Sequence, residues 1–479
     1  MRGVAMKRIR RILLCILMIT VLCGISVVGN SVVNSENKSK EKKRTTITKE
    51  EVKEWAAPDE ESLEYYDLGE FSTTLPVVYM NTKGQQVLKE NAIWGNIALL
   101  DGNGEEQSVF SLPNSIYRAT IKYRGASSYS KFDKKQYRIK FYKNEKDSAK
   151  EVSLAGMGAN SEWVLNGPYL DKTLIRNKLV YDLARELNGW APDTRFVELF
   201  VDGEYQGVYL AVEPVTNGES RLRLAEFGLL SGETAYIVNR DRIDTGSEEI
   251  DTWGKTNGYT YNALYIRYPS KNKITEKQKA YIQKDISEFE QVLYGKNFSD
   301  KRIGYQAYID MDNWVDYFII NEFAMNYDAG NLSTYLYKEL DGKLQLAVWD
   351  FNNGFDNYQW FRTETDVLHT VENSWFQRLW QDENFRDRVC ERYRQLRETT
   401  LADEHIAEKI ASYQEELGEA VDRNFKVWGY SFKENLLAGT SKEGTSRNIR
   451  SYEEAMKQLT DTIRERLAYL DKELGGNLE

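Results

Sequence analysis

The sequence is poor in the residues on which most nucleophilic and zinc enzymes depend. Its 479 residues include only two histidines and three cysteines. The histidines, His369 and His405, both lie in stretches with helical character. The sequence therefore has very few of the residues that zinc sites and Ser/His/Asp or Cys/His catalytic groups require. Any chemistry has to depend on carboxylates, amides and cations.

The sequence also lacks the usual signatures of nucleic-acid and nucleotide binding. The formal net charge is −10 and the Lys and Arg residues are scattered, without the basic stripe of a nucleic-acid binder. There is no GxxxxGK[ST] motif, and "AGMGANSE" breaks the spacing of GxGxxG. These absences argue against nucleic acid as a partner and against a P-loop or Rossmann nucleotide site.

The first 70 residues are expected to lie outside the folded domain. Residues 1–30 combine a basic start with an apolar run from about Ile12 to Val28, which predicts a signal peptide or a single membrane anchor. The pattern leaves these two alternatives open. Residues 31–70 are charged and polar and predict a flexible tether. If a signal is removed, Cys390 is the only cysteine left and no disulfide forms within the chain.

The remaining residues, 71–475, predict one α+β domain with a strand-rich part over about 71–270 and a helical part over about 271–475. "LPVVYM", "SIYRATIKYRG" and "KQYRIKFYK" alternate apolar and polar residues as strands do. "DKTLIRNKLVYDLARELNG" predicts a helix capped by Asp171. "RFVELFVDGEYQGVYLAVEPV" predicts a hairpin, and a loop-rich section follows to about Ser270. Apolar residues at helical spacing then dominate the chain.

A second predicted hairpin brings two aspartates together. "LSTYLYKEL" and "KLQLAVWD" flank Asp341-Gly342, a strong turn signal, and should pair as antiparallel strands. Asp328 lies just before this hairpin and Asp350 at its end, so both are expected at one edge. The nearby oxygen donors are Asn331, Asn352, Asn353 and Asp356. Such hard ligands suit Mg²⁺ or Mn²⁺, which commonly bridge to substrate phosphates. The alternative is that these residues only cap turns and form a polar loop.

Four segments give the chain a family resemblance. They are "YRGASSYSKFDKKQYRIKFY" (residues 123–142), "WVLNGPYLDKTLIRNKLVYDLA" (163–184), "VELFVDGEYQGVYLAVEPV" (197–215) and the hairpin region 326–357 with its Trp349-Asp350. In this order they resemble the CotH kinase family, the spore-coat protein H family of atypical kinases. The likeness spans roughly Leu75 to Arg397.

The resemblance implies an atypical protein-kinase-like two-lobed fold that moves the γ-phosphoryl group of ATP to Ser or Thr hydroxyls of a protein. Carried onto matching positions, Asp328 resembles the catalytic base and Asp350 the Mg²⁺ ligand that bridges the β- and γ-phosphates. Phosphoryl transfer depends mostly on positioning the reactants and neutralising their charge, which carboxylates, amides and cations can do. The implied cofactors are ATP and Mg²⁺ or Mn²⁺.

Candidates for the phosphate-binding cations are less sharply defined by the sequence. Arg124 and Gly125 precede three small residues that would form a turn over phosphates. Lys140 is favoured over Lys134 and Lys135 because a strand would hold it rigidly. Glu213 stands where the family places a Glu and would pair with that lysine. Arg176 is an alternative phosphate anchor, and each of these residues also has a purely structural interpretation.

The chain departs from the family pattern at two positions, which leaves other functions open. Asn352 stands where many members carry a second Asp, and Ser333 where an Asn is common. An exported kinase also meets little ATP. One alternative is therefore an inactive coat or surface scaffold, or pseudokinase. Another is a carbohydrate-active protein that uses Asp328 and Asp350 as acid and base beside the aromatic "WDFNNGFDNYQWF".

The N-terminal segment and the family resemblance together predict a location for the protein and the partners that it contacts. The protein would be exported or membrane-anchored, at the cell surface or in a spore coat, and would contact the membrane only through its N-terminal segment. Its partners would be ATP and a Ser/Thr-rich coat or surface protein.

Overall fold

The structure is a computed structural model that describes residues 53–143, 148–228, 230–242, 246–260, 262–437 and 447–476. The segment predicted as a signal peptide or anchor, residues 1–30, lies outside the described residues, as does the first part of the predicted tether. Within the described part of the chain, no helix has the length and apolar content needed to cross a membrane.

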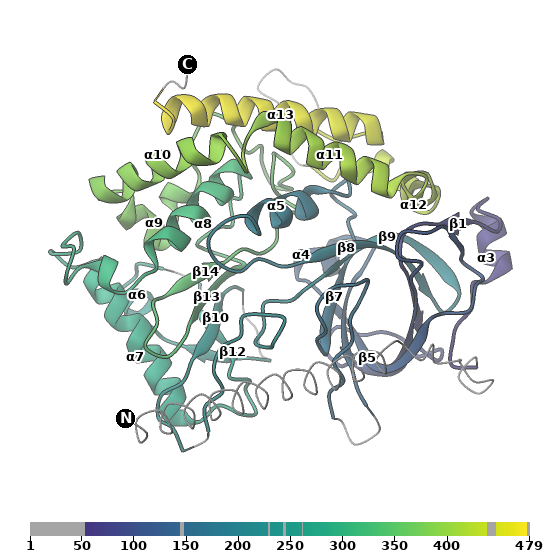
Figure 1. The fold of residues 1–479 in the computed structure, drawn as a ribbon, viewed down its shortest axis with the longest axis horizontal. Helices are drawn as coiled ribbons and strands as arrows, with labels where there is room; N and C mark the ends of the chain where they lie inside the picture. The colour runs from purple at the N-terminus through teal and green to yellow at the C-terminus, as the bar shows by residue number, and fades with distance from the viewer. Residues whose placement is uncertain are drawn as a thin grey trace, which may run out of the picture. The chain divides into compact units, whose positions relative to one another are not determined.

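The N-terminal half builds a closed barrel (Figure 1). In barrel order its strands are β2 (Val77–Asn81), β3 (Ile93–Leu100), β5 (Ser115–Arg124), β6 (Gln136–Phe141), β7 (Glu162–Asn166), β9 (Glu204–Val212) and β8 (Thr194–Val201). Parallel pairing of β2 with β8 closes the ring, while the other neighbours pair antiparallel. Alternate side chains such as Ile121, Ile139 and Leu199 fill the interior. The three strands predicted from period-two alternation are thus confirmed as β2, β5 and β6.

The hairpin predicted around Asp202-Gly203 is also confirmed, as β8 and β9. Both turn residues have positive φ, +49° at Asp202 and +90° at Gly203. A two-residue turn of this hand matches the twist of the strands that it joins, and Asp-Gly tolerates it well.

Residues 53–70, which we expected to be part of the tether, fold against the barrel. They contain helix α3 (Glu60–Tyr65), whose N-cap Asp59 also donates its backbone N–H to the carbonyl of Gly203 at 2.9 Å. Leu63 is buried with barrel residues such as Tyr79 and Phe200. The few apolar residues in this polar stretch are enough to attach it, so folded structure begins before Leu75. A two-stranded ribbon of β1 (Ser72–Thr73) and β4 (Gln107–Ser108) follows.

A five-stranded antiparallel sheet lies beside the barrel (Figure 1). Its order is β11 (Glu248–Ile250), β12 (Leu264–Tyr268), β10 (Tyr236–Arg240), β13 (Thr334–Lys338) and β14 (Gln345–Ala347). β13 and β14 are the second predicted hairpin, and their pairing is confirmed, with Tyr335 opposite Ala347. The sheet takes strands from both sides of residue 270, so it joins the two parts of the domain that we predicted to be strand-rich and helical. The section expected to be loop-rich supplies β10, β11 and β12.

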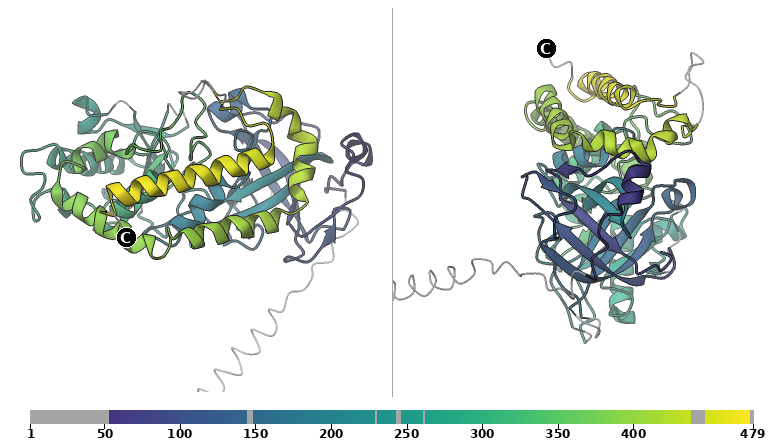
Figure 2. Two further views of the ribbon diagram at one scale, coloured as in Figure 1. Left: turned by 90° about the horizontal axis from the view of Figure 1, so that it is seen from above. Right: turned by 90° about the vertical axis from the view of Figure 1, so that its right-hand side faces the viewer.

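Helices pack around the sheet and along one side of the barrel (Figures 1 and 2). They are α4 (Ser127–Lys131), α5 (Arg176–Ala184), α6 (Trp253–Thr256), α7 (Glu276–Leu293), α8 (Met311–Phe323), α9 (Ser374–Leu379), α10 (Glu383–Arg397), α11 (Asp403–Leu417), α12 (Ala420–Trp428) and α13 (Tyr452–Glu473). Short 3₁₀ turns are η1 (Tyr305–Ala307), η2 (Thr370–Glu372) and η3 (Gly429–Lys433). In both figures α13 runs beside α11.

Helix α5 begins five residues later than the predicted N-cap at Asp171. The carboxylate of Asp171 accepts the backbone N–H of Thr173 at 3.1 Å and that of Arg176 at 2.9 Å. It therefore organises the turn that leads into the helix, and the helix itself starts at Arg176.

One hydrophobic cluster joins the barrel wall, the sheet and the helices. It includes Phe196 and Leu210 of the barrel, Ile237 and Leu336 of the sheet, and helix residues such as Phe318. The α+β class, with a strand-rich N-terminal half and helices toward the C-terminus, is confirmed. The kinase-like two-lobed arrangement stays a prediction.

Candidate functional site

A cleft of about 430 Å³ opens where the barrel meets the five-stranded sheet. Its walls come from β5 and β6, the turn before α4, the end of β10, and the segments on either side of the β13–β14 hairpin. Five of the residues predicted from sequence line it: Arg124, Asp328, Asp350, Asn352 and Asn353. The other five predicted residues, Asn331, Asp356, Lys140, Arg176 and Glu213, lie outside its lining.

The hairpin brings Asp328 and Asp350 into this cleft in the way that its pairing predicts. Asp328 lies in a turn in which its carbonyl accepts the N–H groups of Asn331 at 3.0 Å and Leu332 at 2.8 Å. Asp350 follows β14 with a positive φ of +66°. Backbone strain of this kind, about 1–3 kcal/mol, persists only where neighbouring groups enforce it.

Helix α5 enforces the conformation of the Asp350 segment. The backbone N–H of Asp350 donates to the Tyr181 hydroxyl oxygen at 3.0 Å, and that of Phe351 donates to Asn177 Oδ1 at 2.7 Å. Both acceptors project from α5. The helix therefore fixes where the Asp350 carboxylate enters the cleft.

The environment of Asp328 suits a proton acceptor. Burial, and next the charge of Asp350, raise the pKa of Asp328 to about 6, while Arg242 and a hydrogen bond with the Asn353 side chain oppose the rise. At pH 7 most of this carboxyl is ionised, yet it binds a proton more readily than an exposed aspartate does. A carboxylate tuned in this direction can act as a general base.

Asp350 is held in a more deeply buried environment. Burial raises its pKa, the Arg124 guanidinium opposes this rise, and the charge of Asp241 adds to it. Arg124 in turn hydrogen-bonds Gln136 Oε1 and lies 5.5 Å from the centre of the Trp349 ring. The cleft thus holds carboxylates that repel one another unless cations compensate them.

The donor set beside Asp350 fits a divalent ion shared with phosphates. Asn352 and Asn353 line the same wall, with Asn352 Nδ2 donating to Asn353 Oδ1 at 3.1 Å. Among the described residues there is no group of three or more His, Cys, Asp or Glu side chains that could enclose a metal by itself. Mg²⁺ characteristically uses one or two carboxylates and completes its shell with water and phosphate oxygens.

Asn331 and Asp356 serve the surrounding loops instead of the cleft. Asn331 Nδ2 donates to Asn373 Oδ1 at 2.6 Å. The Asp356 carboxylate accepts from the backbone N–H of Thr363 at 2.7 Å and from Arg447 Nη2 at 2.8 Å. Neither residue lines the cleft, so the structure does not bring these two predicted ligands together with Asp350.

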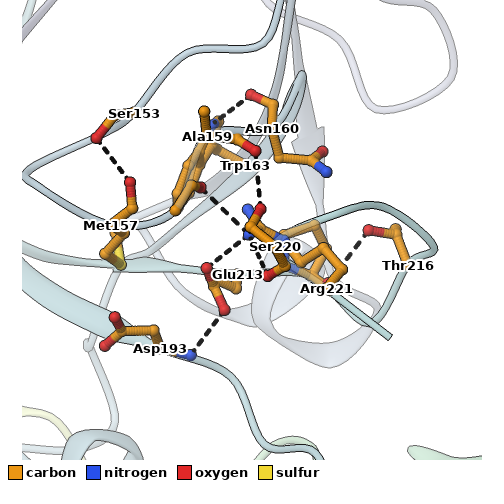
Figure 3. A network of polar contacts seen from close by, with 12 residues as sticks. Ser153, Met157, Ala159, Asn160, Trp163, Asp193, Glu213, Thr216, Ser220 and Arg221 are labelled. Atoms are coloured by element: carbon orange, nitrogen blue, oxygen red, sulfur yellow. Dashed lines mark hydrogen bonds and ion pairs between the residues drawn. The ribbon is translucent and has the colours of Figure 1, made fainter. Parts of the chain in front are cut away.

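Lys140 and Glu213 do not form the predicted pair. Lys140 on β6 lies directly opposite Glu162 on β7 and forms an ion pair with it at 3.1 Å. Glu213 is buried and pairs with Arg221 Nη1 at 2.5 Å, while its other oxygen accepts the backbone N–H of Asp193 at 3.1 Å (Figure 3). Cross-strand register therefore gives Lys140 another partner, and an arginine from an irregular segment does the same for Glu213.

Arg176 is a structural anchor behind the cleft. Its side chain is 1% exposed, pairs with Asp171 at 2.5 Å and donates from Nε to the carbonyl of Gly354 at 3.2 Å. Gly354 follows Asn353, so Arg176 supports the end of the loop that carries the amides. It cannot reach a phosphate in the cleft without leaving these partners.

Sequence reasoning missed several charged residues that line the cleft. They are Lys89, Lys122, Arg138, Asp241, Arg242 and Arg267. With Arg124, six cations face three aspartates there, although the whole chain carries a net charge of −10. The apolar run before Asp241, "AYIVNR", was the available signal for a strand that ends at this site. A local excess of cations favours an anionic ligand.

Gly125 lies in the turn that lines the cleft, and its replacement tests whether this turn is needed for stability and binding. Its φ is +93°, and a Cβ there would lie 2.1 Å from Ser128 Oγ. We expect Gly125→Ala to lower the free energy of unfolding by about 1–3 kcal/mol and, because the turn lines the cleft, to weaken the ATP binding that the sequence predicts. Gly84→Ala is the control, because Gly84 also has a positive φ, +71°, but lies in open space. Urea unfolding and ATP titration of both variants check this, and equal ATP affinities would contradict it.

Together, these observations describe an α+β protein with a cleft that combines paired aspartates with an excess of cations. A family profile described as CotH kinase protein matches residues 121–470. The chain therefore belongs to this family.

One curated relative is similar over part of the chain. It is "Inner spore coat protein H" of Bacillus subtilis (strain 168), with 28% identity over 234 residues. The match covers 48% of this chain and 57% of the relative. The chain thus spans little more than half the length of that relative.

Proposed function

We propose that this protein transfers the γ-phosphoryl group of ATP to Ser or Thr hydroxyls of a coat or surface protein. The observation that carries the proposal is the meeting of Asp328 and Asp350 in one cleft lined by six cations. Membership of the CotH kinase protein family supports the same reaction. A kinase-like two-lobed arrangement, with the barrel as one lobe, is part of this proposal.

Asp328 is the general base of the proposed reaction. The acceptor hydroxyl donates to its carboxylate as the oxygen attacks the γ-phosphorus, and the proton passes to Asp328 as that bond forms. The raised pKa of Asp328, about 6, makes it a stronger base than an exposed aspartate, and because this value is still below 7 most of the carboxyl is ionised at neutral pH.

Asp350, with the amide oxygens of Asn352 and Asn353, would hold Mg²⁺ or Mn²⁺. When bound, the ion supplies positive charge to the β- and γ-phosphates. Asn352 contributes no charge, so the negative charge of this wall comes from Asp350 with Asp241 nearby. Arg124 faces Asp350 and would bind phosphate oxygens as the nucleotide enters.

The name of the relative, "Inner spore coat protein H", supports a location in the spore coat or at the cell surface. The predicted N-terminal signal or anchor fits that location. The acceptor is then a Ser/Thr-rich coat or surface protein.

ATP binding tests the proposal. We expect the full-length protein to bind ATP in the presence of Mg²⁺ or Mn²⁺, and Asp350→Asn to weaken that binding by at least about tenfold, because the metal loses its carboxylate ligand. Asp341→Asn is the matched control, because Asp341 is exposed in the hairpin turn. Isothermal titration with and without a chelator measures both. Equal ATP affinity in wild type and Asp350→Asn would contradict the proposed metal site.

A further inference from the structure

Arg242 joins the two walls of the cleft. It follows β10 on the sheet side, and its Nη1 donates to Ser127 Oγ on the barrel side at 2.8 Å. Both residues line the cleft, although 115 positions separate them in the chain.

The strand pairing fixes where Arg242 lies. Arg240, the last residue of β10, pairs with Thr334 at the start of β13. Asp241 and Arg242 therefore extend past the sheet at the edge where Ser333 and Asp328 lie. The backbone N–H of Arg242 donates to Asp241 Oδ1 at 2.8 Å, which anchors the residue while its side chain stays exposed.

Charge interactions place the guanidinium near both essential aspartates. The charge of Arg242 lowers the pKa of Asp328 and also that of Asp350. Arg124 acts on Asp350 and Asp241. The guanidinium of Arg242 therefore acts electrostatically on both the predicted base and the predicted metal ligand, within the cleft that all three residues line.

The partner of Arg242 differs from that of Arg138, whose guanidinium is already paired with a carboxylate. Arg267 donates to Asn239 Oδ1 at 2.6 Å and to Ser247 Oγ at 2.8 Å, and Arg138 pairs with the carboxylate of Glu162. Arg242 contacts a hydroxyl oxygen, which neutralises none of its charge. A guanidinium can exchange such a contact for phosphate oxygens, which it binds more strongly and in a bidentate manner.

We propose that Arg242 binds the phosphoryl group in transfer and exchanges its contact with Ser127 for the γ-phosphate oxygens of ATP. This inference rests on the proposed function. In the transfer step the acceptor oxygen bonds to the γ-phosphorus, and the bond from that phosphorus to the β–γ bridging oxygen breaks. The electron pair leaves with ADP and the hydroxyl proton goes to Asp328. Arg242 stabilises the charge on the transferred group without giving up a proton.

The test compares nucleotides that differ in the γ-phosphate. We expect Arg242→Gln to weaken ATP binding by about tenfold and to leave the affinities for ADP and AMP within about twofold of wild type. It should also lower kcat for phosphoryl transfer by about 10²–10³-fold with a smaller change in KM. Arg242→Lys should recover only part of both losses, because it keeps the charge but lacks the planar fork.

Arg464→Gln is the control, because Arg464 is exposed on α13, away from the cleft. Isothermal titration of ATP, ADP and AMP to full-length proteins gives the affinities, and labelled ATP gives kcat. The inference is overturned, and the proposed function stands, if the wild-type protein binds ATP and transfers phosphate while Arg242→Gln has an ATP affinity and a kcat within twofold of the wild-type values. If wild type binds no ATP, both are overturned.

Discussion

Replacing Asp328 with asparagine is expected to lower the rate of phosphoryl transfer by about 10²–10⁴-fold, the range typical of a lost general base. The asparagine amide has nearly the same shape but cannot accept the hydroxyl proton. ATP binding should stay close to wild type, because in the proposed complex the phosphates contact the metal at Asp350 and the cations, and not Asp328. Transfer of labelled γ-phosphate and ATP titration on the same preparations separate the two effects.

The Asp341→Asn protein is again the control for this substitution. It makes the same chemical change in an exposed turn and should transfer phosphate at the wild-type rate. A transfer rate of Asp328→Asn within threefold of wild type would show that another group accepts the proton.

Replacing Arg176 with methionine is expected to lower the free energy of unfolding by about 3–5 kcal/mol. Arg176 and Asp171 form a buried ion pair, with exposed side-chain fractions of 1% and 4%. Methionine fills much of the space but leaves the Asp171 carboxylate without its cation. The Gly354 carbonyl and the Gln458 side chain also lose a donor.

The same substitution should weaken ATP binding in the protein that still folds, because Gly354 ends the loop that carries Asp350 and the two amides. Urea unfolding measures the first effect and ATP titration below the unfolding midpoint the second. Arg464→Met, on an exposed helix face, should change stability by less than about 0.5 kcal/mol. A loss below about 1 kcal/mol for Arg176→Met would contradict the structural role of the pair.

Local patterns account for the parts of the fold that the sequence predicted well. Alternating residues in β5 and β6, and the Asp202-Gly203 turn, depend on neighbours a few positions away. The β13–β14 hairpin is local as well, which explains why the positions of Asp328 and Asp350 could be predicted. Short-range turn chemistry and hydrophobic alternation determine such elements.

Long-range pairing accounts for what the sequence did not predict. β10 is a short strand whose partner β13 lies almost a hundred residues later, and only that pairing places Asp241 and Arg242 in the cleft. The closure of the barrel by parallel pairing of β2 with β8 has no local signature either.

The ion-pair partners of charged residues on the strands were the least predictable part of the site. Lys140 was selected because a strand would hold it, and β6 does hold it, but register gives it Glu162 as a partner. Arg221, the partner of Glu213, follows in an irregular segment that no periodicity identifies. The partner of a charged side chain on a barrel strand depends on the neighbouring strand and its register, which sequence alone did not specify.

The substitution of Asn352 for a second aspartate does not leave the cleft short of negative charge. Asp241 enters from β10, and its charge raises the pKa of both Asp328 and Asp350. Arg124, Arg242 and Arg267 in turn act on Asp241. The cleft therefore sets three carboxylates against a surrounding group of cations, which is compatible with the metal–nucleotide complex that we propose.

Transfer of the labelled γ-phosphate of ATP is the most direct test of the central claim. Full-length wild type, Asp350→Asn and Asp341→Asn would be incubated with Mg²⁺ or Mn²⁺ and with two acceptors, casein as an acidic protein and myelin basic protein as a basic one. Phosphorylation of the protein itself would be followed in parallel. The account predicts label on Ser or Thr with wild type and Asp341→Asn, and none with Asp350→Asn. ATP binding that depends on Asp350 without any labelled protein would contradict the kinase function and favour an inactive scaffold.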